Sequence, residues 1–203
     1  MDGGCGVADI RALNRRTLEV TAGLVGQARP AQLDQPTPCA EWTLRQLLGH
    51  MTGQHYGFAA AARGETRDMT IWADRPVGDD FATGYARAVA EVIAAFSQLD
   101  LSRDRLWLPE IRPGIRFPAQ MAIGFHFLDY VVHGWDVARS IGVPVAFDAE
   151  VLSEAQVRAA RVPEGEPRLA AGAAFRPAVT APPDAAPLDG VVARLGRSPR
   201  WPG

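Results

Sequence analysis

The chain has 203 residues, of which 47% are hydrophobic and 22% are charged, and its formal net charge at pH 7 is -2. That length suits one domain with a substantial core. The small net charge gives no electrostatic reason to expect nucleic acid or an anionic membrane as a partner. No run approaches the roughly 20 apolar residues of a membrane span, and the N-terminal sequence MDGGCGVADI lacks the basic and apolar regions of a secretory signal. We therefore expect a soluble cytoplasmic protein.

All 21 basic residues are arginines. The absence of lysine excludes Schiff-base chemistry, lysine-bound pyridoxal phosphate and a Walker A loop, because each requires a lysine amine. The two cysteines, Cys5 and Cys39, do not form a disulfide framework, and the lack of any C-x-x-C pair excludes a cysteine-rich zinc knuckle.

Apolar residues at helical spacing predict helices over about residues 7–28, 43–63, 80–98 and 119–141, with a shorter one over 148–161. Thr43 and Gln46 have the spacing of a capping box, and Gly142 followed by Pro144 is a conventional stop. The segment 101–118 is rich in proline and glycine, which predicts an extended or hairpin-like excursion and not a helix.

Four long helices with one long crossover predict a mainly all-α fold, a four-helix bundle. We expect residues 1–162 to form the bundle and the proline-rich residues 163–203 to form an irregular tail packed on the same domain. Because bundles hold metal ions between facing helices, inward-pointing ligands are the first candidates for a functional site.

The four histidines divide equally between the second and fourth predicted helices: His50 and His55 on one, His126 and His133 on the other. Asp129 and His133 are four residues apart, which lets two helical side chains converge on one ion. With His126 they form a polar stripe that adjoins the apolar face of its helix. For a single histidine in such a place, a hydrogen-bonded core role is the ordinary alternative to metal binding.

A strip of three glycines at four-residue steps, Gly49, Gly53 and Gly57, lies beside His50 on the second predicted helix. Each glycine in a helix interior costs about 0.5–1 kcal/mol relative to alanine. The strip therefore indicates that something lies close beside His50. Close packing of a neighbouring helix is favoured over space for a ligand.

Three further polar residues have ordinary expected roles. His55 is expected to be a packed histidine. Asp136 is expected to form an ion pair with Arg139, three residues later. Cys39 has no basic partner adjacent in sequence, so a loop or core thiol is expected, and not a nucleophile.

The sequences TPCAEWTLRQLLGHM and FHFLDYVVHGWDVARSIG, with DGVVARLGRSP in the tail, resemble the DinB-like fold. The resemblance covers most of the chain and is closest to the actinobacterial branch related to mycothiol-dependent maleylpyruvate isomerase. It implies a divalent metal, commonly zinc, held by His50, Asp129 and His133. Nickel, iron or manganese also suit two histidines and a carboxylate. The isomerases usually have glutamate in place of Asp129, and residues 163–203 are too few for their additional C-terminal domain.

Three protein ligands leave a coordination position open, which is typical of a catalytic metal, and a coordinated thiol is deprotonated. We therefore expect a mycothiol-dependent transferase or isomerase acting on a small electrophilic metabolite. His126 is the candidate for orienting a ligand or for shuttling a proton. A metal-dependent hydrolase and a non-catalytic metal- or metabolite-binding bundle are the alternatives. The expected partner is a small-molecule substrate, with no nucleic acid and no membrane, for a monomer or homodimer.

Overall fold

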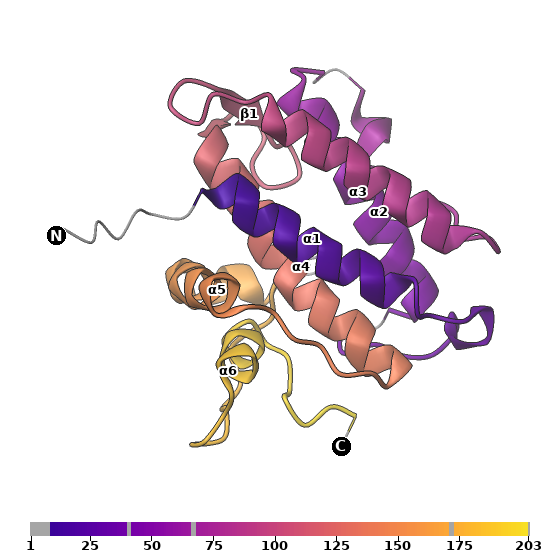
Figure 1. Ribbon diagram of the computed structural model, residues 1–203. Coiled ribbons are helices and arrows are strands. Elements are labelled where there is room, and N and C mark those ends of the chain that lie inside the picture. The colour runs from indigo at the N-terminus through magenta and orange to yellow at the C-terminus, as the bar shows by residue number, and fades with distance from the viewer. Residues whose placement is uncertain (1–8, 40–41, 66–67, 171–172, 203) are drawn as a thin grey trace, which may run out of the picture.

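A computed structural model describes residues 9–39, 42–65, 68–170 and 173–202. Its elements in chain order are α1 (Ile10–Val25), η1 (Pro30–Gln32), α2 (Leu44–Ala62), η2 (Met69–Trp72), α3 (Phe81–Ser97), β1 (Arg105–Trp107), β2 (Arg116–Pro118), α4 (Ala119–Ile141), α5 (Ala149–Arg161), η3 (Glu166–Arg168) and α6 (Pro187–Arg194). The mainly helical fold is confirmed, and the long helices lie where periodicity predicts them (Figure 1). The predicted helix start at residue 7 lies outside the described residues. None of the described helices combines the length and hydropathy that a membrane crossing requires.

Helices α1 and α4 lie side by side and run in the same direction (Figure 1). Asn14 hydrogen-bonds His126 near the starts of the two helices, and Thr21 contacts Gly134 further along both. The pair is close because Gly134 has no side chain: a Cβ there would lie 2.7 Å from Cγ2 of Thr21.

Helices α2 and α3 run in the opposite direction to this pair. On α2, His55 contacts His126 and His50 approaches His133, so α2 is antiparallel to α4. On α3, the hydroxyl of Tyr85 donates to Thr21 of α1. The carbonyl of Leu99, just beyond the end of α3, accepts from Arg11 at the start of α1, so α3 is antiparallel to α1. Since α2 and α3 share a direction, the segment between them must cross the length of the bundle, which is the predicted long crossover.

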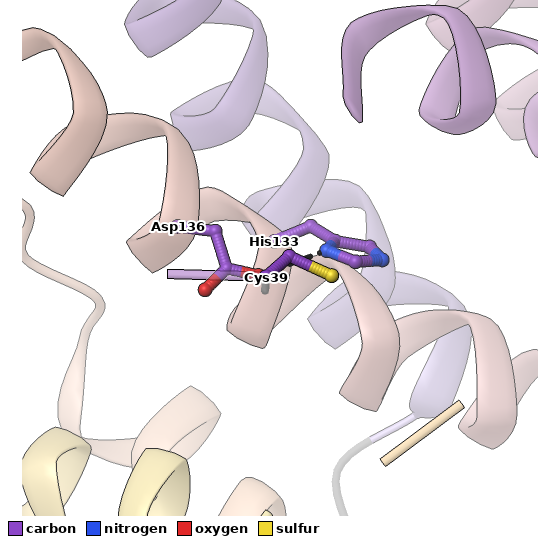
Figure 2. Close-up of side chains that lie close together, drawn as sticks. All are labelled: Cys39, His133 and Asp136. Carbon is purple, nitrogen blue, oxygen red and sulfur yellow. Dashed lines mark hydrogen bonds and ion pairs between the residues drawn. The ribbon is translucent and has the colours of Figure 1, made fainter. Parts of the chain in front are cut away.

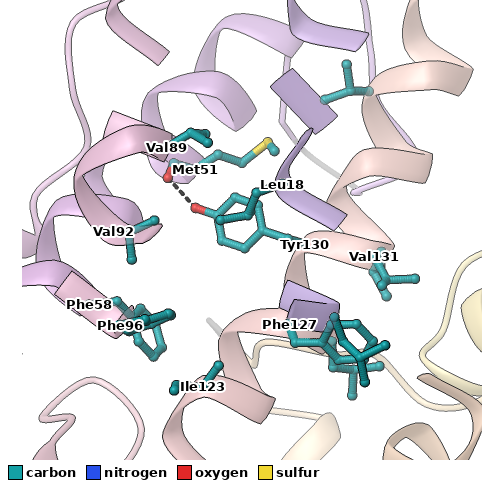
Figure 3. Close-up of a cluster of buried hydrophobic side chains, with 14 of the residues drawn as sticks. Leu18, Met51, Phe58, Val89, Val92, Phe96, Ile123, Phe127, Tyr130 and Val131 are labelled. Carbon is teal, nitrogen blue, oxygen red and sulfur yellow. Dashed lines mark hydrogen bonds between the residues drawn. The ribbon is translucent and has the colours of Figure 1, made fainter. Parts of the chain in front are cut away.

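The core lies where the four helices meet (Figure 3). Tyr130 of α4 is fully buried, and its hydroxyl donates a hydrogen bond to the backbone carbonyl of Met51. Around it lie apolar side chains from all four helices, among them Leu18, Phe58, Val92, Phe96 and Phe127. Burial of each such side chain contributes about 1.5–3 kcal/mol, so the bundle does not depend on its polar residues for a core.

The segment after α3 forms the expected hairpin, in which β1 and β2 are antiparallel with Leu106 opposite Phe117. The tail differs from expectation, because it contains α6, which packs against α5 and α4. Pro187 begins α6 at a position where proline is favoured, although the many prolines of the tail had predicted irregular structure. The guanidinium of Arg168 ties the tail together by donating to several backbone carbonyls, including those of Pro163 and Arg194.

The glycine strip of α2 packs against the chain segment 72–75. A Cβ at Gly49 or Gly53 would lie 2.7 or 2.5 Å from a backbone carbonyl oxygen of this segment, and one at Gly57 would lie 2.3 Å from the ring of Trp72. Close packing is therefore the reason for the strip. The neighbour is the end of η2 with the loop that follows it, and not one of the long helices.

We predict that Gly53→Ala lowers the free energy of unfolding by about 1–3 kcal/mol, because the new methyl group overlaps backbone that cannot move away independently. Gly23 of α1 is the matched control, since a Cβ there meets nothing within 4 Å. Gly23→Ala should raise the free energy of unfolding by about 0.5–1 kcal/mol. Urea denaturation of both variants checks this, and effects of the same sign would contradict the assigned packing.

Candidate functional site

A cavity of about 870 Å³ lies between α2, α4, α5 and the tail. Ligand sites typically have volumes of about 300–1,000 Å³. Most of its wall is apolar, with Phe58, Trp72, Phe125 and Leu128 among the lining side chains. The cavity is therefore large enough for a metabolite, with a mainly apolar wall that carries several charged groups.

His50, Asp129 and His133 all line this cavity. Nε2 of His133 lies 3.5 Å from Oδ1 of Asp129, and the ring centroids of His50 and His133 are 6.0 Å apart. Two imidazoles bound to one tetrahedral zinc ion, with bonds of about 2.0–2.1 Å, have ring centroids about 5 Å apart. The structure thus places the three predicted ligands around one cavity, with the two imidazole rings about 1 Å farther apart than a shared zinc ion requires.

The two histidines are held in the same way, each through Nδ1 by a carboxylate. Nδ1 of His50 lies 3.3 Å from Oδ1 of Asp74, and Nδ1 of His133 lies 3.1 Å from Oδ2 of Asp136. Figure 2 shows the second pair, with Nε2 on the opposite side of the His133 ring. Metal-binding histidines are usually held through their other nitrogen in this way, which fixes the tautomer and the ring orientation.

The glycine strip explains how Asp74 reaches His50. Asp74 belongs to the segment that packs on Gly49 and Gly53, and the backbone N–H of Arg75 donates to the carbonyl of Gly49 at 2.9 Å. A side chain at either glycine would push this segment away from α2. The costly glycines therefore serve His50 indirectly, by admitting its carboxylate partner.

Asp136 is fully buried and forms its ion pair with Arg197 of the tail, at 3.2 Å. The predicted pair between Asp136 and Arg139 is wrong: Arg139 donates to the carbonyl of Pro199 instead. Arg197 is 61 residues from Asp136, so no local spacing in the sequence pointed to it. Nη2 of Arg197, the nitrogen that pairs with Asp136, also lies 3.4 Å from Sγ of Cys39.

The charges of this cluster shift the pKa of each member. Burial lowers the pKa of His50, and the neighbouring His133 lowers it further. Burial also disfavours charged His133, but Asp129 and Asp136 outweigh it and raise the pKa of that imidazole. Burial alone would raise the pKa of the Asp136 carboxyl, yet Arg197 and His133 hold it below its ordinary value.

Cys39 is kept protonated at neutral pH, because burial raises the pKa of its thiol to about 11. Cys39, His133 and Asp136 have possible ligand atoms within 4.8 Å of one another (Figure 2). However, Cys39 and Asp136 both accept hydrogen bonds from Arg197, whose positive charge opposes a cation at that place. The other side of His133, facing Asp129 and the cavity, is the better position for a metal ion.

His126 and His55 lie in the core, and neither is among the residues that line the cavity. Nδ1 of His126 is 2.8 Å from Oδ1 of Asn14, and its Nε2 is 3.2 Å from Nδ1 of His55. His126 therefore donates to Asn14 and accepts from His55, which requires a neutral His126. Burial lowers the pKa of His55, so the neutral form of that imidazole is favoured as well. The predicted role of His126 in orienting a metal ligand or moving a proton finds no support in these contacts, while His55 is packed as expected.

Comparison with known proteins places this arrangement in context. Residues 15–138 match the family model described as the mycothiol maleylpyruvate isomerase N-terminal domain. Two uncharacterized proteins of Mycobacterium tuberculosis, from strains CDC 1551 / Oshkosh and ATCC 25618 / H37Rv, are each 32% identical over 187 residues, covering 92% of this chain and 97% of the relative. No solved structure matches the chain significantly. The family match contains His50, Asp129 and His133, whereas Arg197 follows it.

We predict that the neutral histidine pair makes the fold sensitive to acid. Burial lowers the pKa of His126 to about 3 and that of His55 well below its ordinary 6.5. At a pH between the lowered pKa values of the folded chain and the ordinary 6.5 of the unfolded chain, the unfolded chain binds protons that the folded chain does not. The free energy of unfolding should therefore fall as pH drops below 6.5. The pair should contribute up to about 2.7 kcal/mol per pH unit to the slope, for two protons, in addition to the contribution of the other titrating groups. Urea denaturation between pH 5 and pH 6.5 measures it, and a slope equal to that of the variant His55→Gln/His126→Gln would contradict the assignment.

We also predict that Arg197→Met lowers the free energy of unfolding by about 3–5 kcal/mol, because it leaves the buried carboxylate of Asp136 without its cation. Adding Asp136→Leu should restore much of the loss, since replacing both partners removes the uncompensated charge. Arg87, exposed on α3, gives the control Arg87→Met, for which a change within about 0.5 kcal/mol is expected. Additive losses in the double variant would show that the two residues are not coupled.

Proposed function

Since the chain belongs to the family of the mycothiol maleylpyruvate isomerase N-terminal domain, we propose that it is a metal-dependent enzyme that uses mycothiol to transfer or isomerise a small electrophilic metabolite. The observation that carries the proposal is the pair of histidines on facing helices, each fixed through Nδ1 by a carboxylate and each lining one cavity with Asp129.

The residues present fit a divalent metal. Within the described residues, Nε2 of His50 has no hydrogen-bond partner, and Nε2 of His133 and the carboxylate of Asp129 are paired only with each other, at 3.5 Å. An ion could take the place of this pair. Three protein ligands leave at least one position open. Zinc suits this set best, and nickel, iron or manganese are alternatives. When bound, the ion would supply a Lewis acid that favours the thiolate form of a coordinating thiol.

The protein's own residues prepare the site for an external thiol. Asp74 and Asp136 fix the rings of His50 and His133, so that little reorientation is needed on binding. Trp42 packs against His50 with ring centroids 4.7 Å apart, and limits access of water. Cys39 has a raised pKa and a hydrogen bond from Arg197, so it does not compete with the external thiol as a thiolate.

Maleylpyruvate itself is not proposed as the substrate. Asp129 is one carbon shorter than the glutamate usual in the isomerases. The proposal therefore concerns the class of reaction, and the substrate follows from the shape and charge of this chain's own cavity.

We predict that purified protein contains about one zinc or related ion per chain, and that His133→Ala lacks it while keeping its helical circular dichroism. The fold should survive because the core around Tyr130 is built from other side chains. Asp136→Asn should weaken metal binding by about 10- to 100-fold, since it removes the group that fixes the His133 ring. Cys39→Ser is the control and should bind metal normally. Full metal content in His133→Ala would show that His133 is not a ligand.

The use of mycothiol is tested by thermal unfolding of the metal-loaded protein. Mycothiol at about 100 times its Kd should stabilise the fold by about 2.7 kcal/mol. The same addition should leave the melting temperature of His133→Ala unchanged, because the thiol binds through the metal. If millimolar mycothiol stabilises neither protein, the thiol-dependent reaction is wrong, whatever the metal content.

A further inference from the structure

Arg158 lies at the wall of the cavity, in space that is open because Gly124 of α4 has no side chain. Its side chain is 17% exposed, and Nε lies 2.7 Å from Oε1 of Glu154, one turn earlier on α5. The guanidinium lies directly over Gly124: a Cβ at that position would be 1.5 Å from Nη1 and 2.3 Å from Cζ of Arg158. Any side chain at position 124 would displace the guanidinium from the cavity.

This contact explains a further glycine in the interior of a long helix, Gly124 of α4. Gly124 lies inside α4, where glycine costs about 0.5–1 kcal/mol relative to alanine. In return, the guanidinium is fixed against the helix. Within the described part of the chain, Nη1 and Nη2 of Arg158 make no hydrogen bond to another residue, and Arg158 and Gly124 both line the cavity. A fixed guanidinium fork with free N–H groups suits a carboxylate, which it can bind through two parallel hydrogen bonds.

The part of the wall that α4 contributes between Arg158 and the candidate metal ligands is apolar, while Gln54 and Glu110 line the cavity as a hydrogen-bonded pair. Along α4 the lining residues after Gly124 are Phe125, Leu128 and then Asp129. Five residues of helix separate Gly124 from Asp129, which corresponds to about 7.5 Å along the helix axis. A ligand that reaches both ends must therefore be elongated, with an apolar middle.

We propose that Arg158 is the anion-binding residue of the substrate site, and that the substrate is an elongated, largely apolar carboxylic acid, aromatic or long-chain. Its carboxylate binds the guanidinium of Arg158, and its reactive end lies toward Asp129 and His133. This deepens the proposed function and rests on it for the chemistry of the reactive end. The anion subsite itself needs no metal. Arg158 follows the residues of the family match, so its role belongs to this chain's own C-terminal part.

Binding of 4-phenylbutanoate and of its neutral analogue 4-phenylbutanamide tests the proposal. Trp42 and Trp72 line the cavity, so intrinsic fluorescence reports occupancy. The full-length protein should bind the carboxylate about tenfold or more tightly than the amide, as expected for charge-assisted hydrogen bonds. Arg158→Gln should bind the two probes equally, and Gly124→Ala, which keeps the arginine but displaces it, should also lose the preference. Arg87→Gln on α3 removes the same charge away from the cavity and should keep it.

Other results would overturn the proposal. They are equal binding of the two probes to the unaltered protein, no binding of either probe, or a preference that survives Arg158→Gln. A preference that disappears only in Arg161→Gln would place the anion on the next arginine of α5. The titrations are made with metal-loaded protein and again after dialysis against EDTA. A preference confined to the loaded protein would mean that the carboxylate binds the ion and not Arg158, whereas a preference in both supports Arg158 even if the metal-dependent function fails.

Discussion

Burial of the Asp136 carboxylate beside His133 is the constraint on which the rest of the site depends. A buried carboxylate needs a cation, and Arg197 of the tail supplies it at 3.2 Å. The tail must therefore fold onto the bundle before His133 can be held with Nε2 facing the cavity. Arg168 ties the tail together through its backbone carbonyls. Residues far from the family match thus determine the orientation of a candidate metal ligand within it.

Glycines in helix interiors solve a second problem, which is how to bring polar groups close to a crowded helix surface. Gly49 and Gly53 admit the segment that carries Asp74 to His50, and Gly124 admits the guanidinium of Arg158. At these three positions a methyl group would collide with the neighbouring residues, so glycine is required although it lowers the stability of the helix. His50 and Arg158 both line the cavity, so the glycines lower helix stability while they help to position two of its polar groups.

Local patterns were sufficient to predict the helices from α1 to α5, because apolar periodicity and the capping box at Thr43 depend only on nearby residues, but they did not predict α6 in the proline-rich tail. The convergence of His50, Asp129 and His133 on one cavity also followed from helix geometry and the family resemblance. Sequence reasoning missed Asp74 and Arg197, which reach the histidines and Asp136 through long-range folding. It also proposed His126 as a residue that orients a ligand or shuttles a proton, since a helical stripe does not show that Asn14 and His55 contact both its nitrogens.

The central claim is that His50, Asp129 and His133 hold a metal ion with a position open to an external thiol. The most direct test is the absorption spectrum of the cobalt(II)-substituted Cys39→Ser variant before and after addition of mycothiol. We predict a tetrahedral cobalt spectrum that gains an intense sulfur-to-cobalt charge-transfer band when mycothiol is added. Because Cys39 is replaced by serine, this band must come from the sulfur of mycothiol. A cobalt spectrum that mycothiol leaves unchanged, or a protein that binds no cobalt, would contradict the claim.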